Sequence, residues 1–359
     1  MAASSHVSVF GSSHSVLGVM DTAKKPEMGI PDMYIRPQEP PIVPDETIPV
    51  FDLKSLLYGN TRDTELDTLY TACKDWGFFQ VVNHGVSSQL LEKLKLEIEK
   101  FFKLPIEEKK RYQIRAGDVQ GYGTVIRSKD QKLDWGDRFY MVINPVERRK
   151  PYLFPELPVS LRDTLERYTS ELRKLGMALL GVLGKAMGME MEEVEKLFDD
   201  GMQSLRMTYY PPCPKPELVV GLTPHSDATG ITILHQVNGV EGLEIKKGGV
   251  WIPVTFLPHA FVVNVGDIME ILSNGTYSSI EHRAAVNKAK ERISIAMFFN
   301  PKFEAEIGPV KSLLSSENPP LFKSMLMEDY FKGFFSRNLN GKSHLEKMRV
   351  KCSDIVKDN

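Results

Sequence analysis

The feature that most constrains the fold is a change of hydrophobic period near residue 202. Beyond this point the apolar residues alternate with a period of two in short runs, which is the pattern of β-strands with one buried face. Glycine and proline separate the runs, and Gly248 with Gly249 marks a hairpin turn. The runs cover residues 205–210, 231–236, 243–245, 251–254, 261–265 and 293–299. Many short strands at this spacing predict an antiparallel sandwich or barrel of the jelly-roll kind.

The first half of the chain has a different pattern. Amphipathic helices are expected from Ser87 to the stop at Pro105 and over residues 161–179, where apolar residues recur every three to four positions. A shorter helix over 65–74 is expected between strands at 48–53 and 78–83, and a polar helical tail over 321–348. We therefore expect an α+β fold: a double-stranded β-helix (jelly-roll) barrel with a helical and mixed N-terminal region and a C-terminal helix. The expected parts are a disordered or extended lead-in (1–47), the N-terminal region (48–200), the jelly-roll core (201–302) and a helical tail (303–359).

Composition limits the partners and the compartment. The 45 Lys and Arg residues nearly balance the 47 Asp and Glu residues, so nothing favours nucleic acid or an acidic membrane surface. The cysteines Cys73, Cys213 and Cys352 have no CxxC spacing, which suits a reducing compartment. The Ser-rich N-terminus has no basic residue before Lys24 and no long apolar run. We expect a cytoplasmic monomer that binds a small molecule; a plastid transit peptide is the minor alternative.

Three residues are candidates for a metal site. His225 and Asp227 lie two positions apart in GLTPHSDATGITIL, so on a strand their side chains would share one face. His282 follows 55 residues after Asp227, at the expected end of another strand. Two histidines and one carboxylate on one face of an octahedron favour non-haem iron(II) and leave positions open for a co-substrate and O₂. A lone HxD pair is weak support, because such pairs are common by chance.

A second set of residues supports the metal site. Arg292, Ser294, Ala296 and Phe298 occupy alternate positions of RISIAMFF and should face one side of a strand. An arginine directed into a barrel is costly unless an anion meets it, and its planar fork suits a carboxylate. Ser294 beside it and Tyr210 from another strand could donate to the same carboxylate, as expected for a dicarboxylic acid. An internal salt bridge of Arg292 and a core role of Tyr210 are the alternatives.

Six segments resemble the plant 2-oxoglutarate/Fe(II)-dependent dioxygenases of specialised metabolism, from about residue 48 to 348. They are DWGFFQVVNHG (75–85), YYPPCP (209–214), PHSD (224–227), NVGDIMEILSNG (264–275), EHR (281–283) and RISIAMF (292–298). The chain is most similar to the branch with the thebaine and codeine O-demethylases, the norcoclaurine synthase-like and the senescence-related oxygenase-like proteins, whose tail resembles LNGKSHLEKMRV. Together these motifs are highly specific.

The resemblance implies a role for each candidate. His225, Asp227 and His282 would bind iron(II), Arg292 and Ser294 with Tyr210 would hold 2-oxoglutarate, and Phe298 would border the substrate. O₂ would be the second co-substrate, with ascorbate as reductant. The chain departs from the family at Thr208, where asparagine is usual, which puts one hydrogen bond near the co-substrate in doubt.

The implied reaction couples decarboxylation of 2-oxoglutarate to oxidation of a C–H bond. The product is an alcohol, or a free hydroxyl group and formaldehyde where an O-methyl group is attacked. An aromatic or polycyclic metabolite such as an alkaloid or flavonoid is expected, since aromatic residues are available to line a pocket: Phe298, Phe299, Tyr122, Trp135 and Phe139. Each of these is equally compatible with a core position. The other hypotheses are an ascorbate-dependent oxidase of the same fold, a zinc hydrolase, for which no HExxH is present, and a catalytically silent binding protein.

Overall fold

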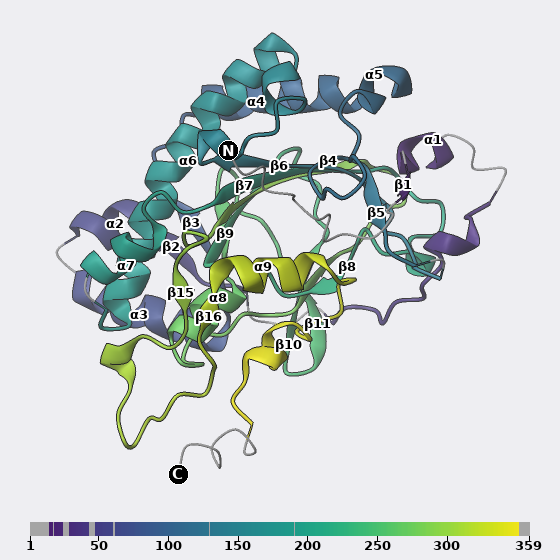
Figure 1. Ribbon diagram of the computed structural model, residues 1–359. Coiled ribbons are helices and arrows are strands. Elements are labelled where there is room, and N and C mark those ends of the chain that lie inside the picture. Colours follow the sequence, from purple (N-terminus) through teal and green to yellow (C-terminus); the bar gives the residue numbers. More distant parts are fainter. Residues whose placement is uncertain are drawn as a thin grey trace, which may run out of the picture.

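The computed structural model describes residues 14–16, 18–23, 29–42, 47–59, 62–128, 130–189 and 191–351. Two facing sheets form the centre of the molecule (Figure 1). In spatial order, the large sheet contains β2 (Val50–Asp52), β3 (Phe78–Val82), β12 (Phe261–Val265), β9 (Ile231–Gln236), β14 (Arg292–Phe299), β7 (Gln203–Tyr210), β6 (Asp137–Asn144) and β4 (Gly121–Tyr122). The small sheet contains β11 (Val250–Pro253), β10 (Leu243–Lys247), β13 (His282–Ala284) and β8 (Leu222–His225).

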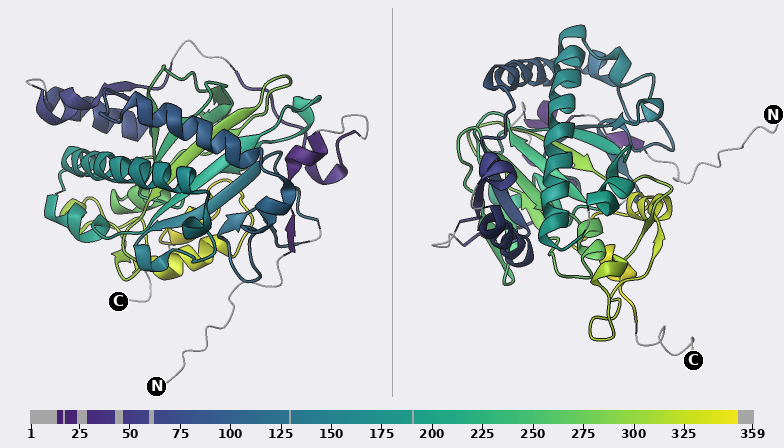
Figure 2. Two further views of the ribbon diagram at one scale, coloured as in Figure 1. Left: turned by 90° about the horizontal axis from the view of Figure 1, so that it is seen from above. Right: turned by 90° about the vertical axis from the view of Figure 1, so that its left-hand side faces the viewer.

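Helices cover the outer face of the large sheet. Figure 2 shows α4 and α6 lying over its strands, and α6 contacts β9 and β14. The helices are α1 (Val19–Ala23), α2 (Leu53–Tyr58), α3 (Arg62–Asp75), α4 (Ser88–Phe102), α5 (Ile106–Lys110), α6 (Val159–Ala186), α7 (Met191–Phe198), α8 (Asp267–Leu272) and α9 (Met327–Phe335). None of the helices in these described ranges combines the length and the apolar character needed to cross a membrane.

Strand β14 shows how the alternating pattern builds the core. Ile293, Ile295, Met297 and Phe299 belong to the hydrophobic cluster beneath the helices. The residues between them face the interior between the two sheets, where they line a cavity. One strand thus supplies an apolar face to the core and a mixed face to the barrel interior.

The predicted jelly-roll barrel is confirmed, and the expected runs after residue 202 all contain strands. The hairpin between β10 and β11 turns at Gly248 and Gly249, whose φ angles of 59° and 85° favour glycine. Two details differ from the expectation: His282 begins β13 rather than ending a strand, and β8 ends at His225, so Asp227 lies just beyond it.

The lead-in differs in part from the expected disordered or extended chain. Residues 1–13 lie outside the described residues, but Val19 begins helix α1 and residues Asp32–Tyr34 form a 3₁₀ turn. Val19 and Tyr34 are buried in a cluster with Trp135. These apolar side chains anchor the segment to the barrel, which polar or proline-rich composition alone does not reveal.

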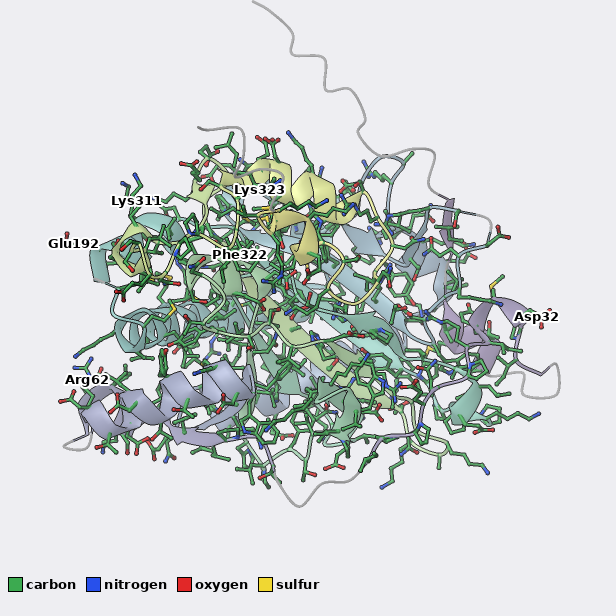
Figure 3. The ribbon with its side chains drawn as sticks, turned by 90° about the horizontal axis from the view of Figure 1, so that it is seen from below. Asp32, Arg62, Glu192, Lys311, Phe322 and Lys323 are labelled. Carbon is green, nitrogen blue, oxygen red and sulfur yellow. The ribbon has the colours of Figure 1, made fainter. Side chains whose placement is uncertain are left out.

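The tail also differs from the helix expected over 321–348. Helix α9 covers Met327–Phe335, and short strands β15 (Glu306–Ile307) and β16 (Met325–Leu326) pair before it. Further along, Phe322 pairs with Arg349, and the backbone N–H of Lys323 donates to Met348. Figure 3 shows Phe322 and Lys323 beside the yellow ribbon of this tail. The tail is therefore held by pairing with itself as well as by one helix.

Candidate active site

The three predicted metal ligands meet inside the barrel. His225 and His282 occupy paired positions of the neighbouring strands β8 and β13, and their ring centroids lie 4.3 Å apart. One carboxylate oxygen of Asp227 lies 3.4 Å from Nε2 of His225 and 3.7 Å from Nε2 of His282. All three side chains are buried, and their potential ligand atoms lie within 4.8 Å of one another. Asp227 reaches this point from the turn after β8, so the side chains of His225 and Asp227 meet without lying on one regular strand.

Backbone carbonyl groups orient both imidazoles toward that point. Nδ1 of His225 lies 2.8 Å from the carbonyl oxygen of Thr223, and Nδ1 of His282 lies 3.1 Å from that of Ile280. A proton on each Nδ1 leaves the lone pair on Nε2. Nε2 of His225 is buried and makes no hydrogen bond with the described residues. A divalent metal would satisfy this atom, so the residues fit an iron(II) ion.

The carboxylate of Asp227 is oriented by two donors on its far side. The hydroxyl group of Thr232 and the amide of Asn264 both donate to Oδ2, at 2.7 and 2.9 Å, and leave Oδ1 toward the imidazoles. Burial opposes ionisation of Asp227, but the imidazole of His282, the hydrogen bonds and His225 outweigh it and lower the pKa of this carboxyl group. Burial and the neighbouring His225 lower the pKa of His282 to about 4. At neutral pH the set therefore consists of a carboxylate and, at His282, a neutral ligand.

An inner cavity next to this cluster contains the predicted anion-binding residues. Arg292 is 2% exposed, and its Nε and Nη2 donate to Oε1 of Gln236 at 3.1 and 2.9 Å. No carboxylate within the described part of the chain pairs with it, so the alternative of an internal salt bridge is not found there. Tyr210 lies opposite Arg292 and Thr208 lies opposite Ser294 on the paired strands β7 and β14. All four residues line the cavity together with Asp227 and His282.

A larger outer cavity opens on the other side of the cluster, with about 890 Å³ of empty space including its mouth. His225 and Asp227 line it, so the predicted metal ligands lie where the two cavities meet. Phe298 and Arg206 line both. Of the five aromatic residues proposed for the substrate pocket, the structure brings Phe298 to a cavity.

The other four aromatic residues were expected to line the substrate pocket, but they are core residues. Phe299 and Phe139 belong to the main hydrophobic cluster, where Phe139 stacks on Phe101. Tyr122 is fully buried and donates to Asp137 at 2.9 Å, and Trp135 packs against Tyr34. Tyr140 and Phe298, which precede or follow Phe139 and Phe299 on their strands and point the opposite way, line the outer cavity instead.

Comparison with known proteins agrees with this geometry. The family model of the 2OG-Fe(II) oxygenase superfamily matches residues 201–301, and that of the non-haem dioxygenase in morphine synthesis N-terminal matches residues 48–157. The oxoglutarate-dependent flavonoid 7-O-demethylase 1 of Ocimum basilicum is 49% identical over 344 residues, which are 95% of this chain and 92% of that protein. This chain belongs to the 2-oxoglutarate- and iron(II)-dependent oxygenases.

Two further relatives of this oxygenase are similar over nearly the whole chain. Codeine O-demethylase of Papaver somniferum is 49% identical over 351 residues, covering 95% of this chain and 98% of that protein. The crystal structure of JOX2 in complex with 2OG, Fe and JA superposes with a TM-score of 0.86 at 36% identity, covering 94% of this chain and 99% of that one. The oxygenase is thus an oxidoreductase that depends on iron(II) and 2-oxoglutarate.

Sequence reasoning missed most of the outer wall of this oxygenase. Tyr140 on β6 and three phenylalanines of α9 line the cavity, as do several arginines. The phenylalanines are Phe331, Phe334 and Phe335, whose spacing of three and four places them on one helix face. That spacing predicts an apolar helix face. It does not show whether this face covers a cavity or packs into the core.

Proposed function

We propose that this oxygenase hydroxylates or O-demethylates a small hydrophobic metabolite with an aromatic or polycyclic body. The observation that carries the proposal is that the buried cluster of His225, Asp227 and His282 lies between two different cavities. The inner cavity offers a buried arginine, and the outer one is lined by aromatic side chains. The relatives named as O-demethylases act on a flavonoid and on codeine, which supports this substrate class.

Each of the proposed ligands has a defined task. His225, Asp227 and His282 would hold iron(II), and Thr232 and Asn264 would fix the direction of the carboxylate. When bound, the iron activates O₂ and 2-oxoglutarate supplies two electrons, so that 2-oxoglutarate, O₂ and R–H become succinate, CO₂ and R–OH. If R–H is an O-methyl group, the hemiacetal formed loses formaldehyde and leaves a free hydroxyl group.

The co-substrate would lie in the inner cavity. Arg292 would receive the distal carboxylate through its fork, with Ser294 and Tyr210 as further donors. Thr208 faces the same cavity and can donate a hydrogen bond with its hydroxyl group, where an amide is usual in the family.

We further propose a monomeric, cytosolic enzyme that uses ascorbate as reductant. The unpaired, buried thiols of Cys73 and Cys213 support a reducing compartment.

The test is an anaerobic titration of the metal-free protein with iron(II) and then with 2-oxoglutarate, followed through the weak visible charge-transfer band of the chelate. Wild type should show the band, and His225→Ala, Asp227→Ala and His282→Ala should lose it together with turnover. Arg292→Ala should keep iron binding but need at least about tenfold more 2-oxoglutarate, since a charged hydrogen-bond pair is lost.

Arg148→Ala is the matched control, because this arginine is an exposed residue paired with Glu304. A wild-type protein that binds iron but gives no band would contradict the assignment of the inner cavity. An unchanged 2-oxoglutarate requirement in Arg292→Ala would contradict the role of that residue.

A further inference from the structure

The outer cavity contains more positive charge than the proposed chemistry uses. Its lining includes four arginines, Arg127, Arg138, Arg206 and Arg337, and one acidic residue, Asp227. Asp227 is already assigned to iron. Contact with an aromatic or polycyclic body, the function proposed for this cavity, needs no cationic side chain.

These arginines are not structural ion pairs. Within the described ranges no carboxylate lies within 4.0 Å of any of the four guanidinium groups. The nearby Asp134 instead pairs with Arg36 at 2.7 Å and accepts from Thr223. By contrast, the buried Arg283 of the small sheet has a carboxylate partner, Glu244, at 2.5 Å. Arg283 thus has a carboxylate that balances its charge, whereas the four arginines of the outer cavity have no such partner in the described ranges.

The strand register places two of these charges together. On the paired strands β6 and β7, Arg138 lies opposite Thr208 and Arg206 lies opposite Tyr140, so the two arginines are diagonal neighbours on one face. Such positions are about 7–8 Å apart, within reach of two long side chains. Like charges this close repel each other unless an anion lies between them.

Each guanidinium group has unused hydrogen-bond donors. Nε of Arg138 donates to the carbonyl oxygen of Gly123 at 3.2 Å, and Arg127 donates to that of Phe335 at the end of α9. Arg206 makes a ring contact with Phe298, and Nη1 of Arg337 is buried with no partner in the described chain. Burial lowers the pKa of Arg138 to about 10, with Asp134 opposing this shift and Arg206 and Arg127 adding to it, so Arg138 still carries its charge at neutral pH.

The loaded inner site would not neutralise these charges. Iron(II) with Asp227, Arg292 and doubly ionised 2-oxoglutarate sums to zero. Arg206 borders both cavities, whereas Arg127 and Arg138 line the outer one and a neighbouring surface groove. An anionic ligand that reaches Arg138 would balance the charge of this partly buried outer wall.

We propose that the substrate is an organic acid, whose carboxylate binds Arg138 and Arg206 while its hydrophobic body lies against Tyr140, Phe298 and the phenylalanines of α9. A planar carboxylate matches the guanidinium fork, and rings are available for the rest of the molecule. This proposal rests on the proposed function and narrows its substrate class. It differs from a neutral alkaloid or flavonoid, which would leave the arginines without a counter-charge.

The test uses a library of aromatic and alicyclic monocarboxylic acids together with the methyl ester of each. Binding to the protein loaded with iron(II) and 2-oxoglutarate is measured anaerobically by equilibrium dialysis, so no turnover is needed. Acids should bind at least about tenfold more tightly than their esters, because esterification removes the charge. Arg138→Gln should weaken acid binding by a similar factor and leave the esters unchanged, and Arg138→Lys should restore part of the loss.

Arg148→Gln on the exposed surface serves as the matched control and should bind acids as wild type does. Equal binding of acids and esters, binding of neutral compounds alone, or no binding of any acid would overturn the proposal.

The charge-transfer band of the same samples distinguishes a failure of the organic-acid proposal from a failure of the proposed function. If the band forms and the acids do not bind, this inference fails alone. If the band does not form, the proposed function fails, and acid binding measured on the metal-free protein still decides whether the arginines form a carboxylate site.

Discussion

At the scale of single residues, the two oxygens of Asp227 have different surroundings. Oδ2 accepts from Thr232 and Asn264, and Oδ1 faces the imidazoles. The direction of the carboxylate is therefore set before any metal arrives, which lowers the entropy cost of forming the site.

Replacing Thr232 with valine should weaken iron binding by about tenfold, since partners of a metal ligand commonly contribute tenfold or more. The measurement is an anaerobic iron(II) titration of the metal-free protein. Thr164→Val is the control, because Thr164 is also buried but bonds locally to Ser160 in helix α6. Equal iron affinity in Thr232→Val and wild type would show that Asn264 alone orients the carboxylate.

The clustering of His225, Asp227 and His282 and the burial of Arg292 could be predicted, because such polar side chains are costly to bury without a partner. The pocket aromatics could not, as β6 shows. Phe139 and Tyr140 are adjacent aromatic residues, and the strand directs one to the core and the other to the cavity. A shift of one residue exchanges the two faces, and only the pairing with β7 fixes which face is which.

At the scale of elements, the period-two runs predicted the barrel strands well because both sheets are hydrophobic on one face. The tail was predicted less well, since its helix covers nine residues and its other contacts are pairings between distant segments. Such pairings have no local signal in the sequence.

One such pairing involves Gly341, which forms a β-bridge with His225 and whose carbonyl oxygen accepts from the N–H of Ser226. Its φ of 49° favours glycine, and a Cβ atom would lie 3.2 Å from the carboxylate of Glu281, next to His282. Gly341→Ala should therefore weaken iron binding roughly threefold to tenfold, by strain of about 1 kcal/mol transmitted to both histidines.

The matched control is Gly239→Ala, whose φ of 68° imposes similar strain with no atom within 4 Å of the new Cβ. Iron titration and thermal unfolding of both variants distinguish the effects. We expect both variants to lose similar stability, but only Gly341→Ala to lose iron affinity. Equal iron affinities in the two variants would mean that the bridge between Gly341 and His225 does not support the metal site.

At the scale of the whole molecule, Asp137 connects the lead-in to the barrel. Its buried carboxyl group accepts from the backbone N–H of Val19 and from Tyr122. Burial raises the pKa of Asp137 despite these bonds. Above its ordinary pKa of 3.8 the folded chain therefore holds this proton while the unfolded chain releases it.

The contribution of Asp137 to stability should then be complete below pH 4 and decrease as pH rises through the raised pKa. The decrease is at most about 1.4 kcal/mol per pH unit. Urea unfolding of wild type and Asp137→Asn across pH 4 to 7 measures it, with the variant expected to lack this term. A difference between the two proteins that does not change with pH would contradict the assignment.

The bridge between Gly341 and His225 also has a consequence for the order of synthesis. Ribosomes release the chain from its N-terminus, so every barrel strand and all three metal ligands emerge before residue 341. The strand that ends at His225 gains its last backbone partner only when this late segment docks. A nascent chain can thus assemble its barrel strands first, and the backbone pairing around His225 is completed only after the tail has left the ribosome.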